Sequence, residues 1–252
     1  NAALIMRKVD VSYFSGIMAA RRAQEGEHFV NFEIMMNSHV SFLTRPNVKY
    51  NSLQELRGKR LGFFTRASTI YNLFAVACKL NGLDVEKDFK LFIAASPGVF
   101  KAFLVRGEVD ATAFWEPFST AMVVKGEARR ITTFQKFWDK ATKGKRPLLF
   151  STLGATKKWV DENPKAARGL AAAIGEARKW IVEHPSEAVA NGLKSIGISD
   201  PKVLKRLETT MVPIYKTPWN KKAIDSGEWL LERLVEQGFL KSVPKWPVYI
   251  KF

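Results

Sequence analysis

The stretch VDATAFWEP, at residues 109–117, decides the fold, because an earlier part of the chain carries a similar phrase. LVRGEVDATAFWEP at 104–117 repeats LIMRKVDVSYFSG at 4–16 with an offset of 100 residues. In a gapless comparison of residues 2–27 with 102–127, seven of the 26 positions are identical. A strand that is used twice at one spacing, between helical segments, predicts two similar lobes.

The two copies differ where the strand ends. In the second copy Trp115, Glu116 and Pro117 follow the apolar run, whereas the first copy has Ser15 and Gly16 at the matching positions. Ligands of α/β sheets bind at the carboxyl ends of strands, where a tryptophan offers a flat wall and a carboxylate accepts hydrogen bonds from an amine or a ring N–H. Helix initiation is the alternative, because an acid and a proline are both favoured in a first helical turn.

Short apolar segments alternate with amphipathic helices, which indicates an α/β fold with mostly parallel sheets. In the long helix that begins at Pro164, we expect one inward-facing stripe. That stripe consists of Leu170, Ala173, Ile174, Ala177 and Ile181. Strands are expected at 9–14, 29–36, 39–43, 59–64, 89–94, 130–134 and 148–153; helices at 15–26, 51–58, 68–81, 96–107 and 116–126; and an exposed crossing at 139–147.

The composition is that of a globular, strongly basic protein. The 252 residues are 46% hydrophobic, and 40 Lys and Arg against 24 Asp and Glu give a formal charge of +16. This charge attracts anions. The basic residues are spread along the chain without a zinc finger, an RNP pattern or a basic helix, so we expect no nucleic-acid partner. No apolar run approaches the roughly 20 residues that span a bilayer.

Enzyme and metal motifs are missing from the sequence. It contains no GxGxxG, GxxxxGK[ST], HExxH or GxSxG pattern, and His28, His39 and His184 are not spaced as a pair of metal ligands. Cys78 is the only cysteine, and it lies in the apolar stripe of its helix. We therefore expect a buried thiol, no catalytic residues, no metal and no cofactor.

The loop TRAST at 65–69 separates an expected buried strand from a helix. The hydroxyl groups of Thr65, Ser68 and Thr69, the Arg66 guanidinium and the N–H groups of the first helical turn could converge on an anion there. The alternative is a helix cap beside a solvated arginine, because serine and threonine are common cap residues. The sequence leaves both interpretations open.

Three segments together resemble a known family. They are NSLQELRGKRLGFFTRASTIYNLFAVACKLNGL from Asn51, SPGVFKAFLVRGEVDATAFWEPF from Ser96, and ATKKWVDENPKAARGLAAAIGEARKWIVEHPSEA from Ala155. In this order they look like the periplasmic solute-binding proteins of nitrate, sulfonate and taurine ABC importers, a group that includes the NMT1/THI5-like binders of pyrimidine precursors. The resemblance covers nearly the whole chain.

The resemblance implies a two-lobed type II periplasmic-binding-protein fold that closes on a ligand held between the lobes. Residues 1–59 and 145–252 would form lobe one, and residues 60–144 would form lobe two. Relatives begin with a strand, a helix and a strand that have no counterpart here, so we expect lobe one to lack them. By position, the ligand contacts would be Thr65, Arg66, Ser68, Thr69, Trp115 and Glu116, with Ser12, Phe14 and Ser15 on the edge of lobe one.

The function that the resemblance implies is capture of a small organic anion, sulfonate-like, taurine-like or nitrate-like, for delivery to an ABC permease. The protein would be a periplasmic monomer and not an enzyme. A pyrimidine or another aromatic heterocycle is the alternative ligand, because Trp115 could stack on it. An enzyme similar to the desulfinases is the alternative from another class, and it would need Cys78 to be reactive.

Overall fold

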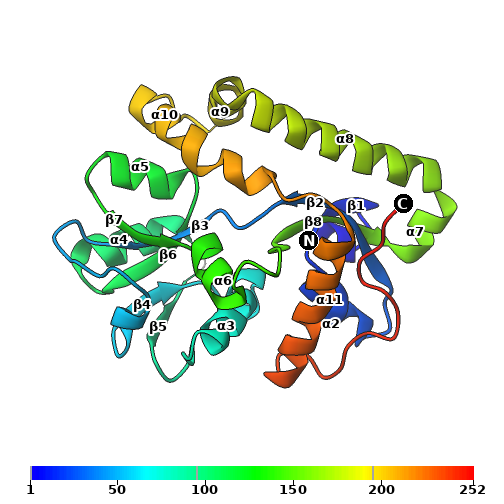
Figure 1. Cartoon of the computed structure of the whole chain (residues 1–252), viewed down its shortest axis with the longest axis horizontal. Helices are drawn as coiled ribbons and strands as arrows, with labels where there is room; N and C mark the ends of the chain where they lie inside the picture. The colour runs from blue at the N-terminus through cyan, green and yellow to red at the C-terminus, as the bar shows by residue number, and fades with distance from the viewer. Residues whose placement is uncertain (1, 95, 195) are drawn as a thin grey trace. The chain divides into compact units, whose positions relative to one another are not determined.

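The computed structural model describes residues 2–94, 96–194 and 196–252 and separates into two compact units (Figure 1). Unit 1 contains the chain up to Ser38, Arg146–Glu183 and Ile214–Phe252. Unit 2 contains His39–Lys145 and His184–Pro213.

The expected division at residues 59/60 and 144/145 therefore changes. Residues 40–44 belong to unit 2 because they pair with two of its strands, and residues 184–213 belong there because their helices pack on α5 (Phe118–Val124).

Unit 2 is built on a five-stranded sheet in the order β5-β4-β6-β3-β7. Strand β4 pairs in parallel with β5 and β6, whereas β3 runs antiparallel to both β6 and β7. The strands are β3 (Val40–Thr44), β4 (Arg60–Phe63), β5 (Lys90–Ile93), β6 (Ala111–Trp115) and β7 (Arg129–Thr133). The β3 strand is the first that the chain forms in this unit, and it is the one that runs against its neighbours.

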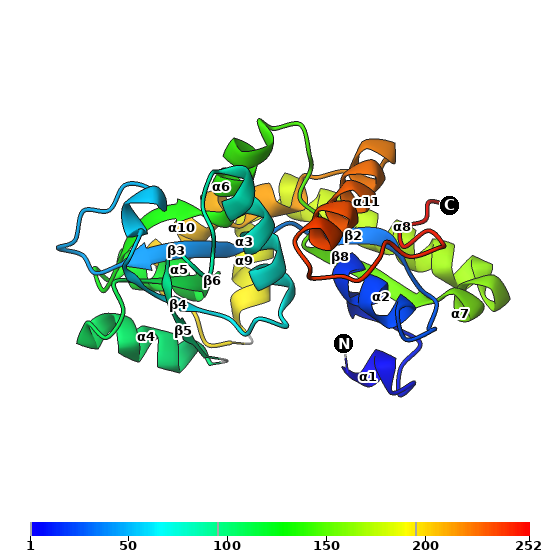
Figure 2. The same ribbon diagram turned by 90° about the horizontal axis from the view of Figure 1, so that it is seen from below.

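Both faces of the unit 2 sheet are covered by helices. On one face, Phe42 and Phe63 pack against Phe74 of α3 (Thr69–Leu80), and Phe74 also contacts Phe137 of α6 (Phe134–Thr142). Helices α3 and α6 lie side by side in Figures 1 and 2. On the other face, Leu43 and Phe114 pack against α4 (Pro97–Arg106) and α5. Neighbouring residues of one strand point to opposite faces, so the adjacent Phe42 and Leu43 of β3 contact helices on opposite sides of the sheet.

Unit 1 contains a three-stranded sheet in the order β1-β8-β2, made of β1 (Val11–Phe14), β8 (Ser151–Thr156) and β2 (Phe29–Met36). The mixed α/β class is as expected, but the mostly parallel pairing expected for this lobe is wrong among the described residues. Strand β8 runs antiparallel to both neighbours. Like β3, β8 is the first strand that the chain forms after it passes from one unit to the other.

The sequence repeat corresponds to a structural repeat. In unit 1 the chain runs α1 (Ala2–Ile5), β1, α2 (Gly16–Ala23) and β2; in unit 2 it runs α4, β6, α5 and β7 at matching positions. An antiparallel strand lies between the two repeated strands in both units. Leu4 and Leu104 are both buried, and Gly26 and Gly126 both adopt a positive φ that closes the turn after the helix. The prediction of two similar lobes is confirmed.

The remaining helices flank the two sheets. They are the 3₁₀ segments Gln54–Leu56 and Val212–Tyr215, α7 (Lys157–Glu162), α8 (Pro164–Glu183), α9 (Pro185–Lys194), α10 (Pro201–Thr210) and α11 (Lys221–Glu236). Residues 139–142 of the expected crossing belong to α6.

The expected stripe of α8 is partly wrong, because Leu170 is exposed whereas Ala167 and Arg178 are buried. Arg178 takes a core position by pairing with Glu33 at 3.0 Å. Among the described residues, no helix is long and apolar enough to cross a bilayer.

Candidate functional site

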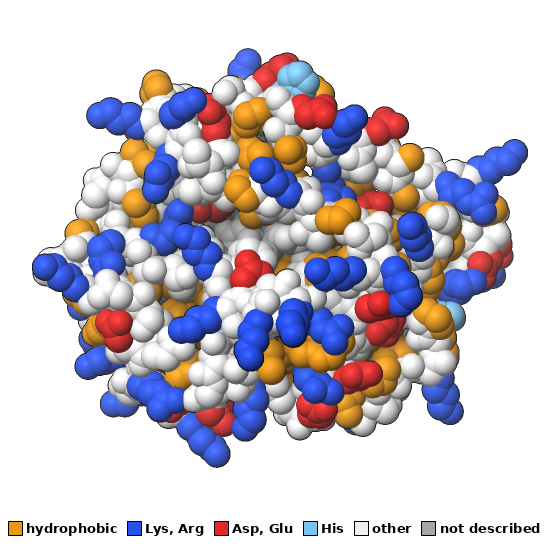
Figure 3. All heavy atoms as spheres, in the orientation of Figure 1, with side chains coloured by type: hydrophobic (Ala, Val, Ile, Leu, Met, Phe, Trp, Pro, Cys, Tyr) orange, Lys and Arg blue, Asp and Glu red, His pale blue; other side chains and the backbone are white. Residues whose placement is uncertain are grey.

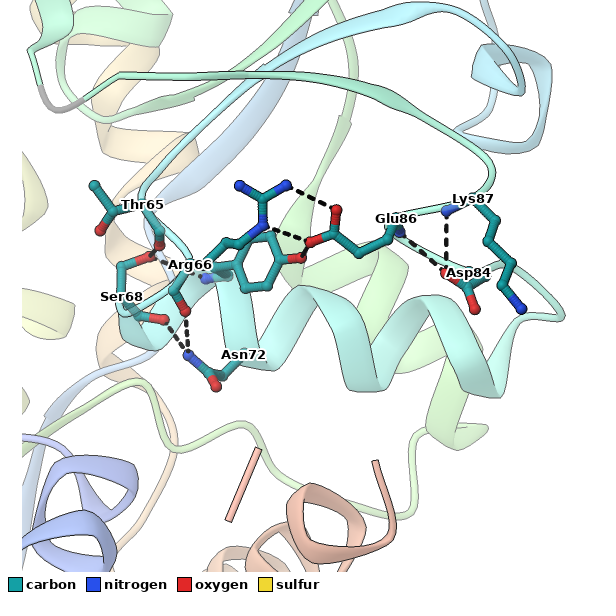
Figure 4. A network of polar contacts seen from close by, with 8 residues as sticks. Thr65, Arg66, Ser68, Asn72, Asp84, Glu86 and Lys87 are labelled. Carbon is teal, nitrogen blue, oxygen red and sulfur yellow. Dashed lines mark hydrogen bonds and ion pairs between the residues drawn. The ribbon is translucent and has the colours of Figure 1, made fainter. Parts of the chain in front are cut away.

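The loop after β4 begins helix α3 at the carboxyl end of a central strand. Ser68 is the N-cap residue: its Oγ accepts a hydrogen bond from the Tyr71 N–H at 3.3 Å and donates one to the Thr65 carbonyl at 2.7 Å. Asn72 Nδ2 donates to the carbonyl oxygens of Arg66, at 3.2 Å, and Ser68, at 2.6 Å (Figure 4). These bonds order the loop, and Thr69 is the first residue of the helix.

Arg66 forms a two-pronged ion pair with Glu86, which lies between α3 and β5. Arg66 Nε is 2.7 Å from Glu86 Oε1, and Nη2 is 2.8 Å from Oε2. The Tyr71 hydroxyl donates to the same carboxylate. The hydrogen bond from Arg66 lowers the pKa of Glu86, and burial raises the pKa of Tyr71. The guanidinium therefore points along α3 towards Glu86 and not towards the Ser68 hydroxyl, although 57% of its side chain stays exposed (Figure 4).

Glu116 is buried and uses both carboxylate oxygens within unit 2. Oε1 accepts a hydrogen bond from Arg130 Nη2 at 2.6 Å, and Oε2 accepts one from the Thr120 N–H in the first turn of α5 at 3.0 Å. Arg130 also donates to Thr120 Oγ1 at 2.8 Å, and burial lowers the pKa of its guanidinium. The structure thus shows the helix-initiating arrangement. Arg130 was not predicted as a site residue, because its only signal in the sequence is a charge inside an expected strand.

Trp115 lies at the end of β6 as part of an aromatic group. Its ring stacks on Phe64, with 5.2 Å between ring centroids, and on Phe114 at 5.8 Å. Trp115 is half-buried, and Val40 of β3 lies opposite it in the sheet. The ring therefore forms an apolar wall beside the loop that follows β4, because Phe64 begins that loop.

The three residues predicted on the edge of lobe one have different roles in unit 1. Ser15 Oγ caps α2 by accepting from the Met18 N–H at 3.3 Å. Phe14 is completely buried against Phe29, with ring centroids 4.9 Å apart, and half-buried Ser12 lies opposite Gly154 in the sheet. The side chains of Phe14 and Ser15 are thus used by the core and by the helix cap.

Tyr249 is a residue of this edge that the sequence did not suggest. A Cβ atom at Gly16, the first residue of α2, would lie 1.8 Å from the Tyr249 hydroxyl oxygen. Gly227 of α11 gives the ring the same close approach, because a Cβ there would lie 2.5 Å from a ring carbon. Gly16 matches Glu116 in the repeat, so the C-terminal segment occupies the space that a side chain at this position would need.

Burial affects the thiol and one imidazole of unit 2. Cys78 is completely buried, and burial raises the pKa of its thiol. Burial also lowers the pKa of His39 to about 4, so that its imidazole is neutral at pH 7. No group of three or more His, Cys, Asp or Glu side chains in the described ranges could hold a metal ion.

Solved structures show which fold the chain has. The alkanesulfonate-binding protein SsuA from Xanthomonas axonopodis pv. citri, bound to MOPS, is similar with a TM-score of 0.79 and 17% identity, over 100% of this chain and 83% of that chain. The periplasmic aliphatic sulphonate-binding protein SsuA from Escherichia coli gives a TM-score of 0.72 and 17% identity, over 100% and 80%. A mutant of DszB in complex with biphenyl-2-sulfinic acid gives 0.64 and 16%, over 96% and 83%. The chain has the fold of the periplasmic binding proteins.

The family follows from the sequence. The model of the NMT1-like family matches residues 44–193, which is more than half of the chain. A search of curated proteins with this chain gave no match. The protein belongs to the NMT1-like family.

Proposed function

We propose that the protein is the solute-binding component of an ABC importer and that it captures a small organic anion at the carboxyl edge of the unit 2 sheet. The observation that carries the proposal is the exposed Arg66 guanidinium beside the N-terminus of α3. A helix N-terminus and a guanidinium both favour a negative group. The alkanesulfonate-binding proteins of the same fold bind ligands of this charge. A membrane permease as partner and a periplasmic location are parts of this proposal.

The Arg66–Glu86 pair suggests a zwitterion of the taurine type as the best ligand. Glu116 is only 4% exposed, so an ammonium group could reach it only if Arg130 or the Thr120 N–H moved away. Both oxygens of Glu86 also have partners, but 46% of its side chain is exposed, so its remaining lone pairs can accept hydrogen bonds from an ammonium group. Glu86 is about half exposed, and its lowered pKa keeps it ionised at neutral pH. A sulfonate bound to Arg66 and an ammonium group bound to Glu86 would each lie beside an opposite charge. The hydroxyl groups of Thr65, Ser68 and Thr69 lie in the same segment, between β4 and the first turn of α3.

The test is a thermal-shift screen with taurine, alkyl sulfonates, nitrate and pyrimidines, followed by calorimetry on each ligand that raises Tm. A ligand at 100 times its Kd stabilises the native state by about 2.7 kcal/mol. Arg66→Ala should weaken a sulfonate by about fivefold or more, because a partly exposed charge-assisted contact is lost. The matched control is Arg106→Ala, since Arg106 is similarly exposed and pairs with Glu108 at 2.6 Å.

The same screen decides between the ligand classes. Equal loss of a sulfonate and a neutral ligand in Arg66→Ala would contradict an anion site at the loop. Binding of pyrimidines alone, abolished by Trp115→Ala, would favour the aromatic-heterocycle alternative, because the Trp115 ring is the aromatic wall at this edge. The desulfinase-like alternative has less support, because its only possible cysteine nucleophile is buried.

A further inference from the structure

Unit 2 contains a hollow of 340 Å³ between α4 and α5, away from the Arg66–Glu86 pair. All residues that line it belong to unit 2. Its size lies at the lower end of the roughly 300–1,000 Å³ of small-molecule pockets. It can therefore hold a compact molecule of one or two rings or a short chain.

The walls of the hollow are mainly apolar. Phe114 of β6, Phe118 and Met122 of α5, and Ile198 from the segment before α10 all line it. Phe118 is 37% exposed, which is high for a phenylalanine. Aromatic and methionine side chains favour an apolar body, and burying one there would remove these side chains from water.

The charged residues of the hollow leave one positive charge. Lys101 and Glu127 pair at 2.7 Å and neutralise each other. Lys125 at the end of α5 also lines the hollow, and none of the contacts in the described parts of the chain pairs its amino group. A negative group bound beside the apolar wall would meet this charge, whereas a cation would be repelled by it.

We propose that this hollow is a second binding site and that it takes a small amphipathic monoanion, an aromatic or short aliphatic body with one sulfonate or carboxylate. The body lies against Phe114, Phe118 and Met122, and the acid group lies at Lys125. The proposal of this second site is independent of the proposed function, because none of the residues that line the hollow belongs to the loop at residues 65–69.

The test is calorimetry with naphthalene-1-sulfonate, with neutral 1-naphthalenemethanol as comparison. Gly98 lines the hollow, and a Cβ added there would meet only one atom, at 3.8 Å, so a side chain can be attached at this position without a clash at its Cβ, and we expect Gly98→Leu to occupy part of the hollow. This variant should weaken the sulfonate at least tenfold, and Lys125→Gln should weaken it about fivefold. The matched controls are Gly169→Leu, in open space on α8, and Lys136→Gln on α6, and both should leave binding unchanged.

Nuclear magnetic resonance of ¹³C-methyl methionine locates the probe. The Met122 methyl resonance should shift on addition of naphthalene-1-sulfonate, whereas that of exposed Met6 should not. Arg66→Ala should leave the shift of the Met122 resonance unchanged even if it abolishes binding at the loop. The experiment therefore tests the loop site and the hollow independently. An unmoved Met122 resonance, equal affinity for the neutral comparison, or full binding by Gly98→Leu would overturn the proposal.

Discussion

At the scale of single residues, Glu116 joins three elements of unit 2. Its carboxylate bonds the first turn of α5 and the Arg130 guanidinium on β7, while its backbone N–H donates to the His39 carbonyl before β3. Both charged side chains are mostly withdrawn from water, with 4% of Glu116 and 17% of Arg130 exposed. Each charge therefore depends on the other, because an unpaired buried ion is costly.

A double-mutant cycle tests this dependence. Glu116→Ala should lower the free energy of unfolding by about 3 kcal/mol, since it leaves Arg130 without a counter-ion. Arg130→Met should cost a similar amount for the same reason. The double variant should cost about 1–2 kcal/mol less than the sum of the two, because neither charge is then left alone. Urea unfolding measures all three values.

The control for this cycle is the exposed pair formed by Arg106 and Glu108, whose side chains are 60% and 44% exposed. Glu108→Ala should change the free energy of unfolding by less than about 0.5 kcal/mol, because water screens the pair. Strict additivity of Glu116→Ala and Arg130→Met would show that their ion pair does not couple the two residues.

At the scale of elements, helices α2 and α8 place glycine in opposite environments. Gly16 at the start of α2 faces the Tyr249 ring so closely that no side chain fits there. Gly169 lies inside α8, and a Cβ added there would meet nothing within 4 Å. The first glycine is required by packing, whereas the second only weakens its helix.

Alanine substitution should therefore have opposite signs at the two positions. Gly169→Ala should raise the free energy of unfolding by about 1 kcal/mol, because alanine loses less backbone freedom in a helix. Gly16→Ala should lower it by about 3 kcal/mol, because Tyr249 must move out of its place. Thermal and urea unfolding check both values. A stabilising Gly16→Ala would mean that Tyr249 does not occupy this position in solution.

At the scale of the whole molecule, the positive charge is distributed and the only thiol is enclosed. Lys and Arg side chains are spread over the face seen in Figure 3 and interspersed with acidic ones, as the sequence indicated. Cys78 lies on α3 within the core of unit 2 and has no exposed surface. Its reactivity therefore reports how often that unit opens.

Thiol labelling makes this measurable. Native Cys78 should react with a thiol reagent only as fast as unit 2 unfolds, because burial both shields the thiol and raises its pKa. In the variant Cys78→Ala with Leu80→Cys, labelling should be immediate, since Leu80 of the same helix is 41% exposed. Fast labelling of native Cys78 that a sulfinate slows would support an enzyme and contradict a purely solute-binding role.

The sequence by itself determined the features that depend on near neighbours along the chain. The repeat of 4–16 at 104–117 predicted two similar units, a helix cap was one of the two interpretations of the loop that contains Ser68, and the apolar stripe of α3 predicted a buried Cys78. Caps and stripes use hydrogen bonds and spacings that lie within one or two helical turns, so local pattern is enough.

Only the tertiary structure decided which polar groups of the candidate site already have partners within the protein. Glu86 takes the Arg66 guanidinium, Arg130 takes Glu116, and Tyr249 fills the space above Gly16. It also decided that β3 belongs to unit 2, through its pairing with β6 and β7. Each of these partners lies on a separate element, and the side-chain pattern of one element carries no record of which charge or ring another element brings against it.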